Sequence, residues 1–162
     1  MKICSLLPSG TEILFALGLG DQIIGVTDLC DYPSEARNKP IVCRSRIDVS
    51  SLSSEQVEEE MCRILSSGEN PYDLDQAWLV ENSPDVVLTQ DLCYFCEVDA
   101  GAVNQAVQSI PKQPQVIVLN PRTVEEIFQS VGDGLSKLFG GVCSAASNFH
   151  NSVKNFKALF WV

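Results

Sequence analysis

The sequence is poor in basic residues, in histidine and in long apolar runs. Lysine and arginine together number 11 against 21 aspartates and glutamates, which gives a formal net charge of -10. Proteins bind nucleic acids by neutralising phosphates with lysine and arginine, so this balance argues against a nucleic-acid partner. No stretch approaches the roughly 20 apolar residues that a membrane-spanning helix needs, so we expect no membrane span.

The amino terminus lacks the apolar run of a secretory signal, which needs about 7–15 residues. Its first apolar run is interrupted by Pro8, Ser9 and Gly10. The seven cysteines, an odd number, fit no complete set of intrachain disulfides. Taken as written, the chain is expected to be cytoplasmic with reduced thiols; the alternative is a mature fragment from which a leader has been removed.

Signatures of catalysis are also missing. His150 is the only histidine, and no Ser-His-Asp set can be assembled around it. The glycines at 18 and 20 end a predicted helix, whereas the dinucleotide fingerprint follows a strand and opens a helix. We therefore expect that the protein is not an enzyme and that it has neither catalytic residues nor a metal centre.

Short β-branched runs alternate with amphipathic stretches. The expected strands are 2–7, 23–27, 85–89 and 116–119, and the expected helices begin near residues 9, 53, 74, 100 and 123. This alternation predicts an α/β fold, a three-layer Rossmann-like lobe with a mostly parallel sheet of four to five strands. The lobe is expected to span residues 1–140, with 141–162 as the start of a joining helix or an atypical tail.

Two helix starts carry the pattern of a capping box, in which a hydroxyl and a carboxylate three residues later satisfy free backbone groups. The pattern occurs at 9–12 and 123–126, while residues 53–56 (SSEQ) open another helix. At 9–12 a second interpretation stays open, because free amides at a helix start also bind anionic ligand groups.

Unusual residues follow the ends of the predicted parallel strands. Ligands of open α/β sheets bind beyond these carboxyl ends. The segments found there are 8–9, 28–32, 90–96 and 120–121. The topology therefore predicts a ligand site along this edge of the sheet.

Several segments resemble one protein family. Residues 6–18 (LLPSGTEILFALG), 24–27 (IGVT), 30–33 (CDYP) and 83–88 (SPDVVL) resemble conserved segments of the substrate-binding proteins of ABC importers, the helical-backbone (class III) type for cobalamin and siderophores. The resemblance implies the amino-terminal lobe of a bilobed receptor, in which one long helix joins two lobes and ligand lies between them. Such receptors are nearly twice as long, so a truncated form is expected.

The resemblance also implies site residues. Tyr32, Arg44 and Arg46 would flank a flat, corrin-like ligand, because aromatic rings and guanidinium planes stack on such surfaces. Strand ends and resemblance together predict these ligand contacts: Pro8, Ser9, Thr11, Asp31, Tyr32, Arg44, Arg46, Gln90, Asp91, Cys93 and Cys96. The expected ligand is a cobalamin-like corrinoid or another metal chelate, with bound cobalamin as the one cofactor considered.

Two alternatives remain open. Cys93 and Cys96 form a C-x-x-C pair, which occurs in thiol redox proteins and in metal sites. Alternatively, a lone lobe with an exposed cleft face would serve as an interaction module that buries this face against a protein partner or a second copy.

Overall fold

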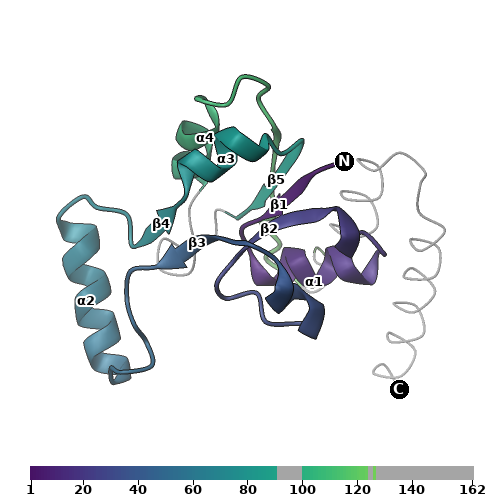
Figure 1. The fold of residues 1–162 in the computed structure, drawn as a ribbon. Helices are drawn as coiled ribbons and strands as arrows, with labels where there is room; N and C mark the ends of the chain where they lie inside the picture. Colours follow the sequence, from purple (N-terminus) through teal and green to yellow (C-terminus); the bar gives the residue numbers. More distant parts are fainter. Residues whose placement is uncertain (91–99, 124–125, 127–162) are drawn as a thin grey trace, which may run out of the picture.

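The computed structural model describes residues 1–90, 100–123 and 126, and these build one curled six-stranded sheet (Figure 1). The strand order is β4-β3-β2-β1-β5-β6. All neighbouring strands are parallel except β3 and β4, which are antiparallel. The strands are β1 (Ile3–Ser5), β2 (Ile23–Thr27), β3 (Ile41–Ser45), β4 (Tyr72–Leu74), β5 (Val86–Thr89) and β6 (Gln115–Val118).

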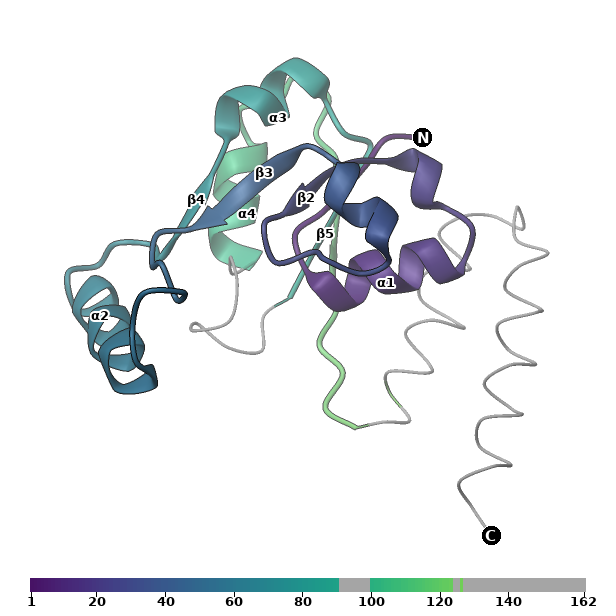
Figure 2. The same ribbon diagram turned by 60° about the horizontal axis from the view of Figure 1, so that its bottom comes forward.

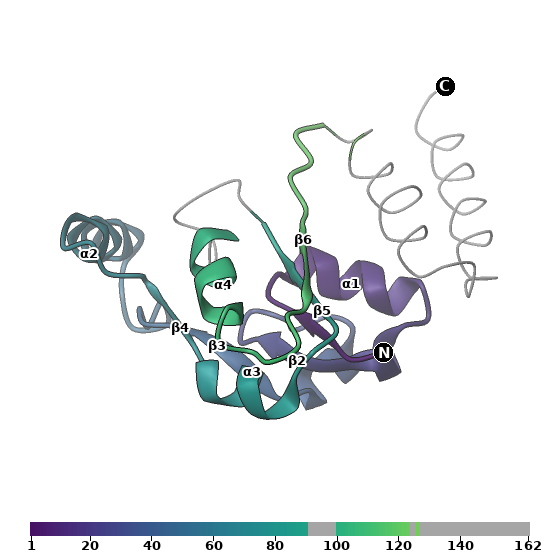
Figure 3. The same cartoon turned by 90° about the horizontal axis from the view of Figure 1, so that it is seen from above.

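Helices cover both faces of this sheet. They are α1 (Pro8–Ala16), α2 (Ser54–Ser66), α3 (Gln76–Asn82), α4 (Ala100–Val107) and the short 3-10 helices η1 (Gly20–Gln22) and η2 (Ser34–Asn38). One face carries α1, and the other carries α3 and α4 (Figures 2 and 3). In all three views α2 stands apart, beyond the β4 end of the sheet.

The alternation of side chains along β1 gives rise to two separate cores. Ile3 is buried with Leu14 and Leu17 of the α1 side, whereas Cys4 is buried with Leu79 and Val103 of α3 and α4. Successive residues of a strand point to opposite faces, so a strand buried on both faces carries apolar or small residues throughout. These two clusters confirm the predicted three-layer α/β lobe with a mostly parallel sheet.

Close packing at the sheet centre requires one glycine. A Cβ atom at Gly25 would lie 2.8 Å from the Trp78 ring and from a methyl group of Val42. The ring of Trp78 thus packs directly on the β2 backbone. Trp78 was predicted to lie in the core, and the structure shows its half-buried side chain packed against the core cluster.

Two strands were not predicted from the sequence. Residues 44 and 45, expected in a loop, belong to β3, where Arg44 pairs with Asp73 and Ser45 with Tyr72 of β4. The loop prediction was wrong because only Val42 and Cys43 are buried in β3. Its apolar run, Ile41 to Cys43, is short and is followed by the polar Arg44 and Ser45.

The predicted helix starts had different outcomes. The helix start predicted at Ser53 is confirmed, and the structure adds a capping box there: the Ser53 hydroxyl accepts from the Gln56 N–H at 3.3 Å, and the Gln56 side chain accepts from the Ser53 N–H at 2.9 Å. The box at Ser9 was wrong, because α1 already begins at Pro8, whose ring presets the first helical φ angle. Ser9 therefore lies inside the first turn.

At the third predicted start, the N–H of Glu126 donates to the Thr123 hydroxyl at 3.2 Å, while the Glu126 carboxylate accepts from the Arg122 N–H at 2.6 Å. The helix that was expected to follow lies outside the described residues. Among those that are described, no helix has the length and apolar character to cross a bilayer.

Candidate functional site

The carboxyl ends of four adjacent parallel strands form one edge of the sheet. Pro8 and Ser9 follow β1, Asp28 follows β2, Arg46 follows β3 and Gln90 follows β5. The fold thus brings these predicted residues to a common edge. Three other predicted contacts, at positions 91, 93 and 96, lie outside the described residues.

A buried network of hydroxyl and thiol groups supports this edge from within. The Thr11 hydroxyl donates to the Ser5 Oγ at 2.9 Å and lies 3.1 Å from the Cys30 Sγ. Thr11 and Ser5 are fully buried, and Cys30 is 4% exposed. Buried polar groups need such partners because an unsatisfied one is costly. Thr11, predicted as a ligand contact, therefore ties α1 to β1 and to the loop after β2.

Asp28 links the ends of β2 and β3. Its carboxylate accepts from the Thr27 hydroxyl at 3.2 Å and from the backbone N–H of Ser45 at 3.1 Å. Its own N–H donates to the Cys43 carbonyl at 3.0 Å. Asp28 lies in the segment 28–32 that was predicted at this edge, but no role was predicted for it. An acidic residue directly after a strand is the signal that was available, since aspartate commonly bonds nearby backbone there.

The loop after β2 presents an aromatic ring to the outside. Tyr32 is 66% exposed, and the peptide bond between Tyr32 and Pro33 is cis. The Arg37 Nε donates to the Asp31 carbonyl at 3.0 Å, and its Nη2 lies 3.6 Å from the Asp31 carboxylate. These contacts connect the loop to η2. A pocket of about 360 Å³ lies between this loop, η2 and the start of β3.

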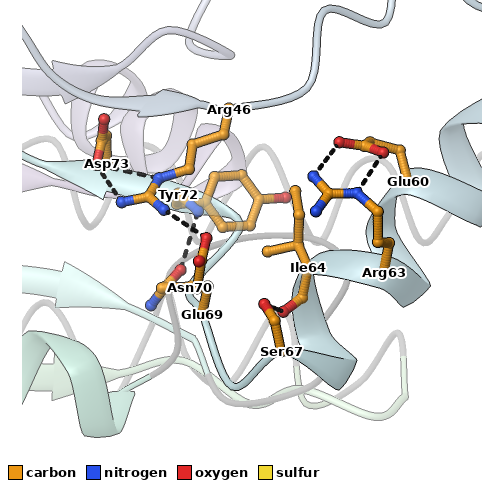
Figure 4. Close-up of polar contacts among 9 residues, drawn as sticks. All are labelled: Arg46, Glu60, Arg63, Ile64, Ser67, Glu69, Asn70, Tyr72 and Asp73. Atoms are coloured by element: carbon orange, nitrogen blue, oxygen red, sulfur yellow. Dashed lines mark hydrogen bonds and ion pairs between the residues drawn. The ribbon is translucent and has the colours of Figure 1, made fainter.

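Arg46 is engaged with acidic side chains near α2 and β4 (Figure 4). Its Nη2 and Nε lie 2.8 Å and 3.2 Å from Asp73 Oδ1, and its Nη1 lies 3.4 Å from Glu69 Oε2. The hydrogen bond and charge of Asp73, aided by Glu69, raise the pKa of Arg46 above its ordinary value. Arg44, by contrast, is exposed on β3.

The buried thiol of Cys4 is held in its neutral form. Burial first, then the neighbouring Cys43 and Cys30, raises the pKa of the Cys4 thiol well above its ordinary value. A neutral thiol is a poor nucleophile and a poor metal ligand. Within residues 1–90, 100–123 and 126, no group of three or more histidine, cysteine or acidic side chains is placed to hold a metal ion.

Comparison with known proteins shows local sequence similarity to transport proteins. No family model matches the chain. Over 53 residues, 33% of this chain, it is 45% identical to the ABC transporter substrate-binding lipoprotein YvrC of Bacillus subtilis, covering 17% of that protein. Over 35 residues, 22% of this chain, it is 51% identical to the vitamin B12-binding protein of Vibrio parahaemolyticus, covering 13% of it.

Solved structures match over nearly the whole chain. The periplasmic vitamin B12-binding protein BtuF of Vibrio cholerae aligns with 98% of this chain at a TM-score of 0.56 and 16% identity. The periplasmic heme-binding protein HutB of the same species aligns with 96% at a TM-score of 0.61 and 19% identity. The chain covers 50% and 47% of these two structures, or about half their length.

These relatives and neighbours are substrate-binding transport proteins rather than enzymes. The expected family relationship is thereby confirmed. The chain is a homologue of ABC transporter substrate-binding proteins and has the class III periplasmic-binding fold over about half the length of its structural neighbours.

Proposed function

We propose that this chain supplies one wall of the ligand site of an ABC-importer substrate-binding protein, and that the ligand is a corrinoid or a related metal chelate. The observation that carries the proposal is the edge formed by the carboxyl ends of β1, β2, β3 and β5. Ligands of such sheets bind beyond this edge. Homologues named for vitamin B12 binding support the choice of ligand class.

Tyr32 has the properties of a ligand-stacking residue in this proposal. Tyr32 is 66% exposed, although the loop that carries it is anchored by the buried Cys30 and by the Arg37–Asp31 contacts. A large exposed ring on an anchored loop loses little conformational freedom when it binds a flat ligand. Pro8, Ser9, Arg44 and Gln90 would border the ring's ligand along the same edge.

Four further residues belong to the proposed ligand site. Asp91, Cys93 and Cys96 are proposed ligand contacts because they continue the chain beyond β5. Arg46 is proposed at the rim, where release from Asp73 would free its guanidinium for a ligand.

We also propose a partner surface, formed by exposed apolar side chains near this edge. Leu29, Tyr32 and Val49 are 42%, 66% and 60% exposed in segments that follow β2 and β3. We propose that a second lobe or a second copy covers them when ligand is held. As for location, the cytoplasm expected from the sequence stays a prediction, since the relatives are described as a lipoprotein and as periplasmic.

The test is titration of the purified chain with cobalamin and cobinamide, followed by absorbance and calorimetry. We expect saturable binding that Tyr32→Ala weakens by about tenfold, equivalent to the roughly 1.4 kcal/mol of a stacking contact. Tyr32→Phe keeps the ring and should bind like the parent chain. No binding at about millimolar ligand, where the binding free energy falls to about 4 kcal/mol, would reject the proposal.

A further inference from the structure

The pocket between the loop after β2, η2 and the start of β3 has more acidic than basic side chains in its lining. It has a volume of about 360 Å³ and lies at the carboxyl end of β2, on the face of the sheet that carries α1. Its polar lining includes the carboxylates of Asp28 and Asp31 and the guanidinium of Arg37. Two carboxylates and one guanidinium leave one net negative charge in the lining.

The carboxylate of Asp28 is held in one orientation. Its Oδ1 accepts from the Thr27 hydroxyl and its Oδ2 from the Ser45 N–H, and the residue is partly buried. A carboxylate has about four acceptor positions, so each oxygen keeps one for a further donor. A fixed acceptor binds a donor with little loss of conformational entropy.

Arg37, the positively charged residue of the pocket, is already bound to Asp31 of the neighbouring loop. Arg37 donates from Nε to the Asp31 carbonyl at 3.0 Å and pairs with the Asp31 carboxylate at 3.6 Å. An incoming carboxylate would compete with Asp31 for Arg37 and would face Asp28 as a like charge. An incoming carboxamide or ammonium group would instead donate to the vacant acceptor positions.

We infer that this pocket selects a ligand whose rim carries hydrogen-bond donors, such as carboxamide groups, over the same ligand with carboxylates. The inference rests on the proposed function and extends it from a class of macrocycle to the chemistry of its side chains. It separates the two ligand types named for the relatives and neighbours, because vitamin B12 carries carboxamides around its ring whereas heme carries two carboxylates.

A matched pair of ligands tests the inference directly. Cobinamide and cobyrinic acid share the corrin ring and cobalt, but the first carries amides where the second carries free carboxylates. We expect cobinamide to bind at least about tenfold more tightly at pH 7 and low ionic strength, a difference of about 1.4 kcal/mol. Salt screens charge interactions between exposed groups, so the ratio should decrease at about 1 M salt.

Three variants locate the source of the preference. Asp31→Asn should lower the affinity ratio severalfold by removing one carboxylate and releasing Arg37, and Asp28→Asn should lower it as well. Arg37→Gln should raise the ratio, because it leaves both carboxylates without the cation. Asp21→Asn removes the same charge on η1, before β2 begins, and should leave the ratio unchanged.

The outcomes distinguish this inference from the proposed function. If neither ligand binds, the proposed function fails and this inference fails with it. If both bind but cobyrinic acid binds equally well or better, only the selectivity is wrong. An Asp21→Asn effect as large as that of Asp31→Asn would also overturn the inference, because net charge rather than the pocket would then set the preference. Since Asp31 is exposed, its variant is not expected to unfold the chain.

Discussion

The sheet with α1, α3 and α4 is held together differently from the arm formed by residues 46–71, which carries α2. In the sheet region, two clusters of buried side chains cover both faces, and many of their members are at most 3% exposed. The arm has one cluster with three buried members, Ile47, Met61 and Ile64. Its ends meet where the Arg46 N–H donates to the Pro71 carbonyl at 2.9 Å.

The difference shows where the positions of the edge residues are determined. Burial on two faces fixes the strands, and the strands place Asp28 and the Tyr32 loop. The arm depends more on the capping box at Ser53 and on exposed ion pairs, namely Arg63 with Glu60 at 2.6 Å and Arg46 with Asp73 (Figure 4). Exposed ion pairs contribute little, about 0–1 kcal/mol each. We therefore expect the arm to open more readily than the sheet region.

The largest effect should come from the sheet region. Leu79→Ala empties a fully buried position between α3 and the sheet and should lower the free energy of unfolding by about 4 kcal/mol. Urea denaturation measures it. Val80→Ala on the same helix, at an exposed position, should change stability by less than about 0.5 kcal/mol. Equal effects of the two substitutions would contradict the assigned packing of α3.

A core substitution in the arm should act locally. Ile64→Ala removes a side chain from the small cluster of α2 and should cost about 2 kcal/mol, the lower end of the range for such changes. Hydrogen exchange should show faster exchange in α2 and unchanged exchange in β1 and β5. Cys62→Ala, on the exposed side of α2, is the control. Faster exchange throughout the sheet would show that the arm and the sheet open together.

Alkaline pH should destabilise the chain through Cys4 in the sheet region. The native pKa of Cys4 is raised, so above about pH 8.5 the unfolded thiol loses its proton while the native thiol keeps it. Stability is therefore complete below that pH and decreases by about 2 kcal/mol by pH 10. Cys4→Ala should remove this part of the pH dependence and Cys62→Ala should not, as denaturation at several pH values would show. If stability decreases equally with pH in both variants, the effect does not come from Cys4.

The smallest effect should come from the start of α2. Ser53→Ala removes the hydroxyl that accepts from the Gln56 N–H and should cost the arm about 1 kcal/mol. The neighbouring Ser54→Ala should be close to neutral. Hydrogen exchange at the first turn of α2 is the measurement. If the two variants behave alike, the cap contributes nothing to the arm.

Local patterns explain which elements could be predicted from the sequence. The cap at Ser53 depends on residues within one helical turn, and the apolar runs of β1, β2 and β5 are contiguous. The start of α1 was misplaced because Pro8 and Ser9 both favour helix starts, and only the structure shows that the proline takes the first position. The strand β3 was missed because its apolar run, Ile41 to Cys43, is only three residues long and is followed by the polar Arg44 and Ser45.

For the candidate site, the sequence alone determined which residues follow the ends of β1, β2 and β5, because alternating strands and helices imply this edge. The tertiary structure decided what each residue contacts. Arg46 pairs with Asp73, 27 residues away, and Thr11 contacts Cys30, 19 residues away. The link between Asp28 and Ser45 likewise spans 17 residues. Such contacts depend on how β1, β2, β3 and β4 lie side by side in the sheet, and no local pattern in the sequence encodes that order.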